Sequence, residues 1–123
     1  MALKVKVFGV NNVVAFLALN ELAIKKGLKD GITESANLLK EEVKESIRGN
    51  RPERRSVDTG DFLKSVEIEG QTNDAIIFSN INHAKFLEFG TSRLPERRHF
   101  RNTKDRNRNK IMDILNKNIR KSI

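Results

Sequence analysis

The stretch His83–Thr91, which reads His-Ala-Lys-Phe-Leu-Glu-Phe-Gly-Thr, decides how the rest of the chain is organised. Its large apolar residues, single carboxylate and closing glycine predict a short helix with Asn82 as the N-cap. Gly90 fits the left-handed position that ends a helix. Residues three apart lie on one helix face, and the buried face is expected to hold Ala84, Leu87 and Phe86.

A long amphipathic helix is expected upstream. Between Val13 and about Ile47, apolar residues recur at spacings of three and four, which places them along one helix face. Gly27 and Gly31 fall among them, where glycine costs a helix about 1 kcal/mol relative to alanine. They predict either a kink or the close approach of another helix, and both remain open. The apolar stripe comprises Ile24, Leu28, Ile32, Ala36, Leu39, Val43 and Ile47.

Strand patterns flank this helix. Residues 3–7 alternate apolar residues with lysines, which predicts an N-terminal strand, and Gly9–Asn12 predicts a turn with an asparagine cap. Residues 66–69 and 75–79 predict the two arms of a β-hairpin, with Gly70–Asp74 as a five-residue connection.

The chain ends in a further helix, predicted to begin near Asn102 or Thr103, with a buried face of Ile111, Leu115 and Ile119. The predicted fold is α+β. An N-terminal strand, a long amphipathic helix, a β-hairpin, a short helix and a C-terminal helix surround a small antiparallel sheet. At 123 residues the chain predicts a single domain, 1–123.

The net charge of +8 is concentrated at the end of the chain. Residues 1–92 hold 13 basic and 13 acidic side chains, whereas residues 93–123 hold 11 basic and 3 acidic ones. A one-sided basic surface attracts phosphates or an acidic protein face. The absence of cysteine excludes disulfides and thiolate metal sites. The longest nearly uncharged stretch, Val7–Asn20, is too short to cross a bilayer.

Two arginine-rich loops are predicted, at 48–56 and 92–101. Each contains the sequence Pro-Glu-Arg-Arg, at Pro52–Arg55 and at Pro95–Arg98. Four residues repeat readily by chance, but both copies precede a motif or a helix, so they are also candidates to face one partner. The arginines expected to face DNA or a partner are Arg54, Arg55, Arg93, Arg97, Arg98 and Arg101.

No group of residues predicts catalysis. His83 and His99 lack the spacing of metal ligands, and there is no glycine-rich phosphate loop. Glu88 lies beside Phe86 and Phe89, and desolvation there would suit a general acid. The favoured interpretation is a carboxylate bonded to backbone amides or to an arginine. We therefore expect a protein that is not an enzyme and holds no metal or cofactor.

Three pieces of the chain carry a family resemblance. Val57-Asp58-Thr59-Gly60 is followed by Leu63 and Ser65; Asn82–Thr91 comes after the hairpin; and Arg98-His99-Phe100 precedes the last helix. In order and spacing they resemble the small morphogenesis proteins of long-tailed phages, which complete the tail or join it to the head. The resemblance covers about residues 36–123. The family usually has tyrosine at the position of His83 and proline at that of His99.

The resemblance implies a ring-forming structural protein at the neck or tail top, without catalytic activity. Implied partners are further copies of the chain, neighbouring neck or tail-tube proteins and packaged DNA, with no membrane. The implied location is the virion, assembled in the host cytoplasm. The residues expected to fix loop geometry are Asp58, Thr59, Gly60, Ser65, Glu88, Gly90, Thr91 and Phe100.

The competing hypothesis is a freestanding protein that binds nucleic acid without sequence preference. Its arginines would neutralise phosphates, although Phe100 is the one aromatic residue among them, which disfavours base stacking. A toxin-like nuclease is disfavoured, because no acidic cluster or paired histidines suggest a metal or general-base site.

Overall fold

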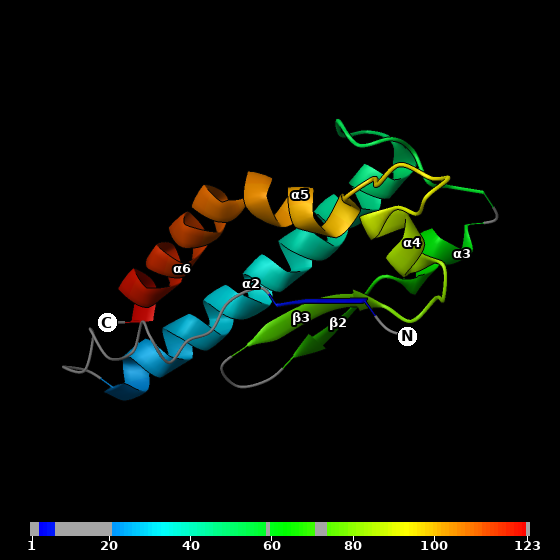
Figure 1. The fold of residues 1–123 in the computed structure, drawn as a ribbon. Helices are drawn as coiled ribbons and strands as arrows, with labels where there is room; N and C mark the ends of the chain where they lie inside the picture. Colours follow the sequence, from blue (N-terminus) through cyan, green and yellow to red (C-terminus); the bar gives the residue numbers. More distant parts are fainter. Residues whose placement is uncertain (1–2, 7–20, 59, 71–73, 123) are drawn as a thin grey trace.

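The computed structural model describes residues 3–6, 21–58, 60–70 and 74–122. A small sheet lies on one side of the long helix α2, and helices α5 and α6 lie on its other side (Figure 1). Helices α3 and α4 lie near the C-terminal end of α2. The mixed α+β fold expected from the sequence is confirmed. The elements are β1 (Leu3–Lys6), α2 (Glu21–Arg48), α3 (Asp61–Ser65), β2 (Glu67–Gly70), β3 (Ala75–Ser79), α4 (Ala84–Phe89), α5 (His99–Arg106) and α6 (Arg108–Ser122).

The sheet has the strand order β1-β3-β2, and both neighbouring pairs are antiparallel. Val5 and Ile68 both pair with Ile77, so the predicted N-terminal strand and hairpin are present. Gly70 pairs with Ala75. Gly70 therefore belongs to β2, and its place in a five-residue connection was predicted wrongly.

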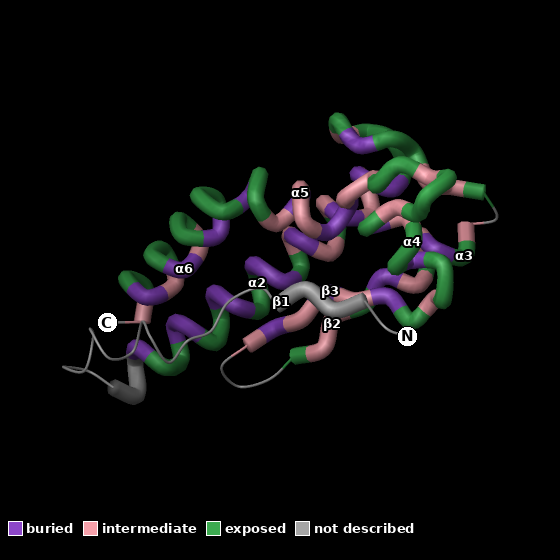
Figure 2. Tube along the Cα trace, viewed as in Figure 1, coloured by how far each residue is buried: buried purple, intermediate pink, exposed green. Residues whose placement is uncertain are grey.

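The hydrophobic core is built on α2. All seven members of the predicted stripe are buried, and Figure 2 shows buried positions recurring along this helix. They join core residues from β3, α3, α5 and α6 in one cluster. The predicted turn at Gly9–Asn12 and the helix start at Val13 lie outside the described residues.

The two glycines of α2 serve close packing. A Cβ atom at Gly27 would lie 2.8 Å from the Asn118 backbone oxygen and 2.9 Å from the Ile119 Cα atom. At Gly31 it would lie 3.2 Å from the Leu115 Cα atom. Helix α2 runs without a break through both positions. Of the two explanations that the sequence left open, close approach of α6 is therefore shown.

The helix α4 differs from its prediction at its start. His83 and not Asn82 precedes the first helical residue, and it makes no side-chain capping bond. Ala84 is buried, whereas Phe86 is 52% exposed, so its predicted burial is wrong. A helix of six residues turns fully less than twice, so it buries a narrow face.

The C-terminal helix was predicted too short and unbroken. Helix α5 begins at His99, and Asn107 separates it from α6. The Asn107 side chain donates a hydrogen bond of 2.8 Å to the Thr103 carbonyl oxygen. Such local bonds let asparagine compete with helical geometry. Ile111, Leu115 and Ile119 form the buried face of α6, as predicted.

Candidate functional site: the paired Pro-Glu-Arg-Arg loops

The first loop, residues 48–56, returns the chain to the end of α2. Gly49 has a φ of +90°, and a Cβ atom there would lie 2.8 Å from Arg55 Cβ. The Ser56 amide donates to the Ile47 carbonyl oxygen at 2.8 Å. The chain thus reverses within a few residues, which presents the intervening Pro-Glu-Arg-Arg sequence at the surface.

The second loop, predicted at 92–101, ends at Arg98 because α5 begins at His99, and it starts at a turn made by Gly90 and Thr91. Gly90 ends α4 with φ 75° and ψ 175°. The ψ differs from that of the left-handed helix expected there, but the positive φ still favours glycine. The Thr91 hydroxyl accepts hydrogen bonds from the amides of Arg93 (3.2 Å) and Leu94 (3.0 Å). Thr91 therefore fixes the start of this loop.

The side chain of Arg97 joins the two loops at the surface. The Arg97 guanidinium donates to the Arg55 carbonyl oxygen at 2.9 Å and to the Ser56 hydroxyl at 2.8 Å. Both copies of Pro-Glu-Arg-Arg, except for Arg55, line one shallow pocket of about 360 Å³. The structure thus brings together two segments more than 40 residues apart, as one shared surface.

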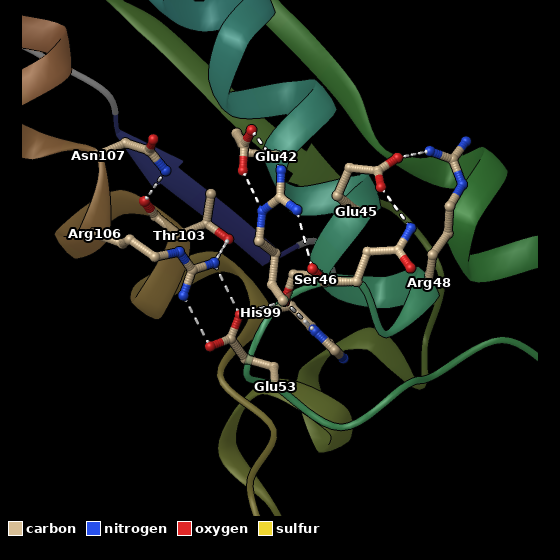
Figure 3. Close-up of polar contacts among 11 residues, drawn as sticks. Glu42, Glu45, Ser46, Arg48, Glu53, His99, Thr103, Arg106 and Asn107 are labelled. Atoms are coloured by element: carbon tan, nitrogen blue, oxygen red, sulfur yellow. Dashed lines mark hydrogen bonds and ion pairs between the residues drawn. The ribbon is translucent and has the colours of Figure 1, made fainter.

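A buried polar chain lies beneath this surface. The ring of His99 is fully buried, with its Nδ1 atom 2.8 Å from the Ser46 hydroxyl and its Nε2 atom 2.6 Å from the Ser56 hydroxyl. The Ser46 hydroxyl donates to a Glu53 carboxylate oxygen at 2.7 Å (Figure 3). Because the Ser46 hydroxyl proton is donated to Glu53, the Ser46 oxygen accepts the hydrogen bond from His99 Nδ1–H. The unprotonated Nε2 atom of His99 then accepts a hydrogen bond from the Ser56 hydroxyl. These bonds assign one tautomer of a neutral imidazole.

Burial lowers the pKa of His99 from 6.5 to about 4. The nearby Glu53 carboxylate works in the opposite direction, and the charge of Arg97 lowers the pKa further. The imidazole therefore stays neutral at physiological pH.

Glu53 is the buried anchor of the first loop. Two Arg106 nitrogens each lie 3.0 Å from its carboxylate oxygens (Figure 3). Burial raises the pKa of Glu53, but hydrogen bonds from Arg106, Ser46 and Asn102 outweigh it and hold the pKa below its ordinary value. This ion pair ties the first loop to α5.

Glu88 caps the N-terminus of α5 from a different helix. Its carboxylate oxygens each accept a backbone amide at 2.9 Å, from Phe100 and from Arg101. The Arg101 Nε atom donates to the same carboxylate at 3.0 Å. The favoured prediction for Glu88, bonds to backbone amides and to an arginine, is confirmed.

Arg101 differs from its prediction as a residue that faces DNA or a partner. Its guanidinium contacts Glu88, lies 3.1 Å from Glu96 and stacks over the Phe89 ring at 4.6 Å. The Arg101 side chain folds back because the Glu88 carboxylate lies at the N-terminus of α5, the helix that contains Arg101. Arg106 is likewise engaged, with Glu53.

The other predicted arginines lie at the surface. Arg54, Arg55 and Arg93 are exposed, and Arg97 and Arg98 are partly buried. Arg98 has a φ of +57°, which is uncommon for a residue other than glycine.

Two of the remaining predicted residues, Gly60 and Ser65, take part in the start of α3 and in its link to the sheet. Gly60 starts α3 with a φ of +89°, Asp58 is exposed, and Thr59 lies outside the described residues. The Ser65 hydroxyl lies 2.6 Å from that of Ser79, which joins α3 to β3. A further predicted residue, Phe100, is buried in the core.

The polar chain through His99 was not predicted. Ser46 follows Val43 by three residues on the buried face of α2, and a serine in an apolar stripe calls for a hydrogen-bonding partner. Nothing in the local sequence identifies that partner, because His99 lies 53 residues away.

Comparison with models of protein families, with curated proteins and with solved structures finds no match. Within the described residues, no group of three or more His, Cys, Asp or Glu side chains is arranged to hold a metal ion. No helix in the same part of the chain is long and apolar enough to span a membrane.

Proposed function

We propose that the chain is a structural virion protein of a tailed phage or prophage, a ring-forming component that completes the tail or joins it to the head. The sequence resemblance motivates this proposal. The observation that carries it is the convergence of the two Pro-Glu-Arg-Arg loops on one cationic surface. Such a surface suits contact with DNA or with an acidic neighbouring ring.

The motif residues support the proposal through what they do in the fold. Glu88 caps α5, Thr91 holds the turn into the second loop, and Ser65 ties α3 to the sheet. Their bonds position loops and join elements of the fold. A role in assembly, without catalysis, agrees with such bonds.

The sheet supplies surfaces through which copies can associate. Strands β1 and β2 are the two edges of the sheet, and strand edges invite pairing with another chain. Repeated head-to-tail association closes into a ring when the rotation between copies permits it. Long helix α2 and the hairpin edge are the proposed contacts between copies.

Electron microscopy of particles tests this function. Deleting the coding sequence from the genome that carries it should leave separate heads and tails in the lysate. Adding the purified full chain should restore joined particles. Normal particles without the gene would contradict the proposal.

The second candidate is a sequence-independent nucleic-acid-binding protein, favoured by the excess of basic residues in 93–123. It predicts that monomeric protein retards ordinary duplex DNA and that added salt abolishes the retardation. A ring-sized mass in native mass spectrometry, without affinity for DNA, would favour the structural role instead.

A further inference from the structure

The pocket between the two loops is lined by three arginines and two carboxylates, Glu53 and Glu96. Glu53 is held by Arg106 through two bonds of 3.0 Å, which compensate its charge. Glu96 is exposed and shares Arg101, at 3.1 Å, with the buried Glu88. The three arginines of the lining, Arg54, Arg97 and Arg98, therefore outnumber the one carboxylate that is not fully compensated.

The bonds of Arg97 leave its charge uncompensated. Its guanidinium donates hydrogen bonds to the Arg55 carbonyl oxygen and the Ser56 hydroxyl, both neutral acceptors. Burial lowers the pKa of Arg97, and the like charge of Arg54 lowers it further. An anion placed between Arg54 and Arg97 would relieve this repulsion.

Arg98 adds a donor without an acceptor. Its Nε atom is buried and has no hydrogen-bond partner among the described residues. Its nearest carboxylate contact, to Glu96, is 3.9 Å, which is too long for a hydrogen bond. The backbone of Arg98 also has a positive φ, which costs energy for a residue other than glycine. Strained residues with unsatisfied donors occur at binding sites.

We propose that this pocket is a binding site for one phosphate group, held by Arg54, Arg97 and Arg98. The inference deepens the proposed function and rests on it for the source of the phosphate, the backbone of packaged DNA. A planar carboxylate is matched by a single arginine fork. A tetrahedral phosphate presents oxygens in several directions and so suits guanidinium groups that approach from two different loops.

The first test is a titration of the full chain, with arginine side chains labelled with ¹⁵N, against inorganic phosphate at constant ionic strength. The Nε–H signals of Arg97 and Arg98 should move and saturate, whereas that of Arg120, which does not line the pocket, should stay in place. Acetate and poly-glutamate serve as carboxylate probes. If they move the same signals with equal affinity, the site is one for an acidic protein, and the phosphate proposal is overturned.

The second test compares variants that lose equal charge. Arg54→Ala with Arg98→Asn removes two pocket cations, and asparagine tolerates the positive φ at position 98. Arg108→Ala with Arg120→Ala removes two exposed cations of α6 that do not line the pocket. We expect the pocket variant to bind a short duplex at least about tenfold more weakly, and the control to change by less than about twofold. Equal weakening would reveal a diffuse basic surface and overturn the inference.

Native mass spectrometry of the same variants, which detects rings, and electron microscopy of particles, which detects joining, together separate this inference from the proposed function. If rings form and particles join but phosphate is not bound, the pocket assignment alone is wrong. If duplex and phosphate bind but deletion of the gene leaves particles intact, the neck role is wrong and the pocket stands.

Discussion

At the scale of single residues, the buried carboxylate of Glu88 holds α4 and α5 together. It is 1% exposed and serves two amides and one guanidinium. Both amides are free donors of a helix start, and because Glu88 and Phe100 are buried, water does not replace the carboxylate when it is lost. Its partner Arg101 also reaches the exposed Glu96.

Glu88→Gln should therefore lower the free energy of unfolding by about 2–4 kcal/mol, because one amide and the guanidinium lose their charged acceptor. Urea denaturation measures this loss. Glu96→Gln, which removes the other carboxylate on Arg101, is the matched control and should cost about 0–1 kcal/mol. Equal losses in the two variants would contradict the capping role of Glu88.

His99 predicts a dependence of stability on pH. Its pKa is about 4 when folded and near 6.5 when unfolded, so the unfolded chain binds more protons below pH 6.5. Stability is therefore fully present above that pH and is lost as the pH falls toward 4. Between pH 7 and pH 5 the free energy of unfolding should drop by about 2 kcal/mol.

Urea denaturation at a series of pH values checks this prediction. His99→Gln should be less stable at pH 7 but should lose most of the slope between pH 7 and pH 5. His83→Gln removes the exposed histidine and should keep the slope. Protonation of hydrogen-bonded carboxylates such as Glu53 also lowers the free energy of unfolding, but this loss occurs at pH values below their ordinary pKa of 4.5. A slope unchanged in His99→Gln would place the titrating group elsewhere.

At the scale of elements, the packing of α6 on α2 depends on two positions without side chains. Gly27 and Gly31 let α6 pack very close to α2. A Cβ atom added at Gly27 would contact backbone atoms of Asn118 and Ile119. The lysine Lys117 and the amide of Asn118 then reach Glu34 across this contact, at 3.1 and 2.7 Å.

Gly27→Ala should destabilise the protein by on the order of 1–2 kcal/mol. Alanine gains about 1 kcal/mol of helix propensity, but forcing α6 outward costs about 1–3 kcal/mol or more. Thermal unfolding followed by circular dichroism measures the outcome. Gly70→Ala is the control, because nothing lies within 4 Å of the added atom. A stabilised Gly27→Ala variant would show that the two helices do not pack closely.

Element types could be predicted from the sequence better than element ends. Apolar periodicity located α2 and α6, because one buried face imposes it along the whole helix. The start of α5 was missed because its cap comes from Glu88, 12 residues away, and not from a neighbouring side chain. The break at Asn107 depends on one local bond that competes with the helix.

At the scale of the whole molecule, the sequence predicted two basic loops but not that they meet. Their contact depends on Arg97 reaching the first loop and on His99 joining α2 to that loop beneath it. Neither side chain has a local signal for these partners. Counting charges in the sequence also could not distinguish two kinds of arginine. Some face outward, whereas Arg101 and Arg106 pair with buried carboxylates.

The whole molecule thus presents one cationic surface assembled from two segments, and the proposed neck role requires that surface. A joining assay on particles that lack the gene tests this requirement most directly. Full-length protein with Arg54→Ala, Arg55→Ala and Arg98→Asn is compared with an Arg108→Ala, Lys110→Ala and Arg120→Ala control of equal net charge, whose three exposed residues lie in α6, after equal thermal stability has been verified. We expect the control to restore joined particles and the loop variant to fail. Equal restoration by both proteins would contradict the role of the paired loops.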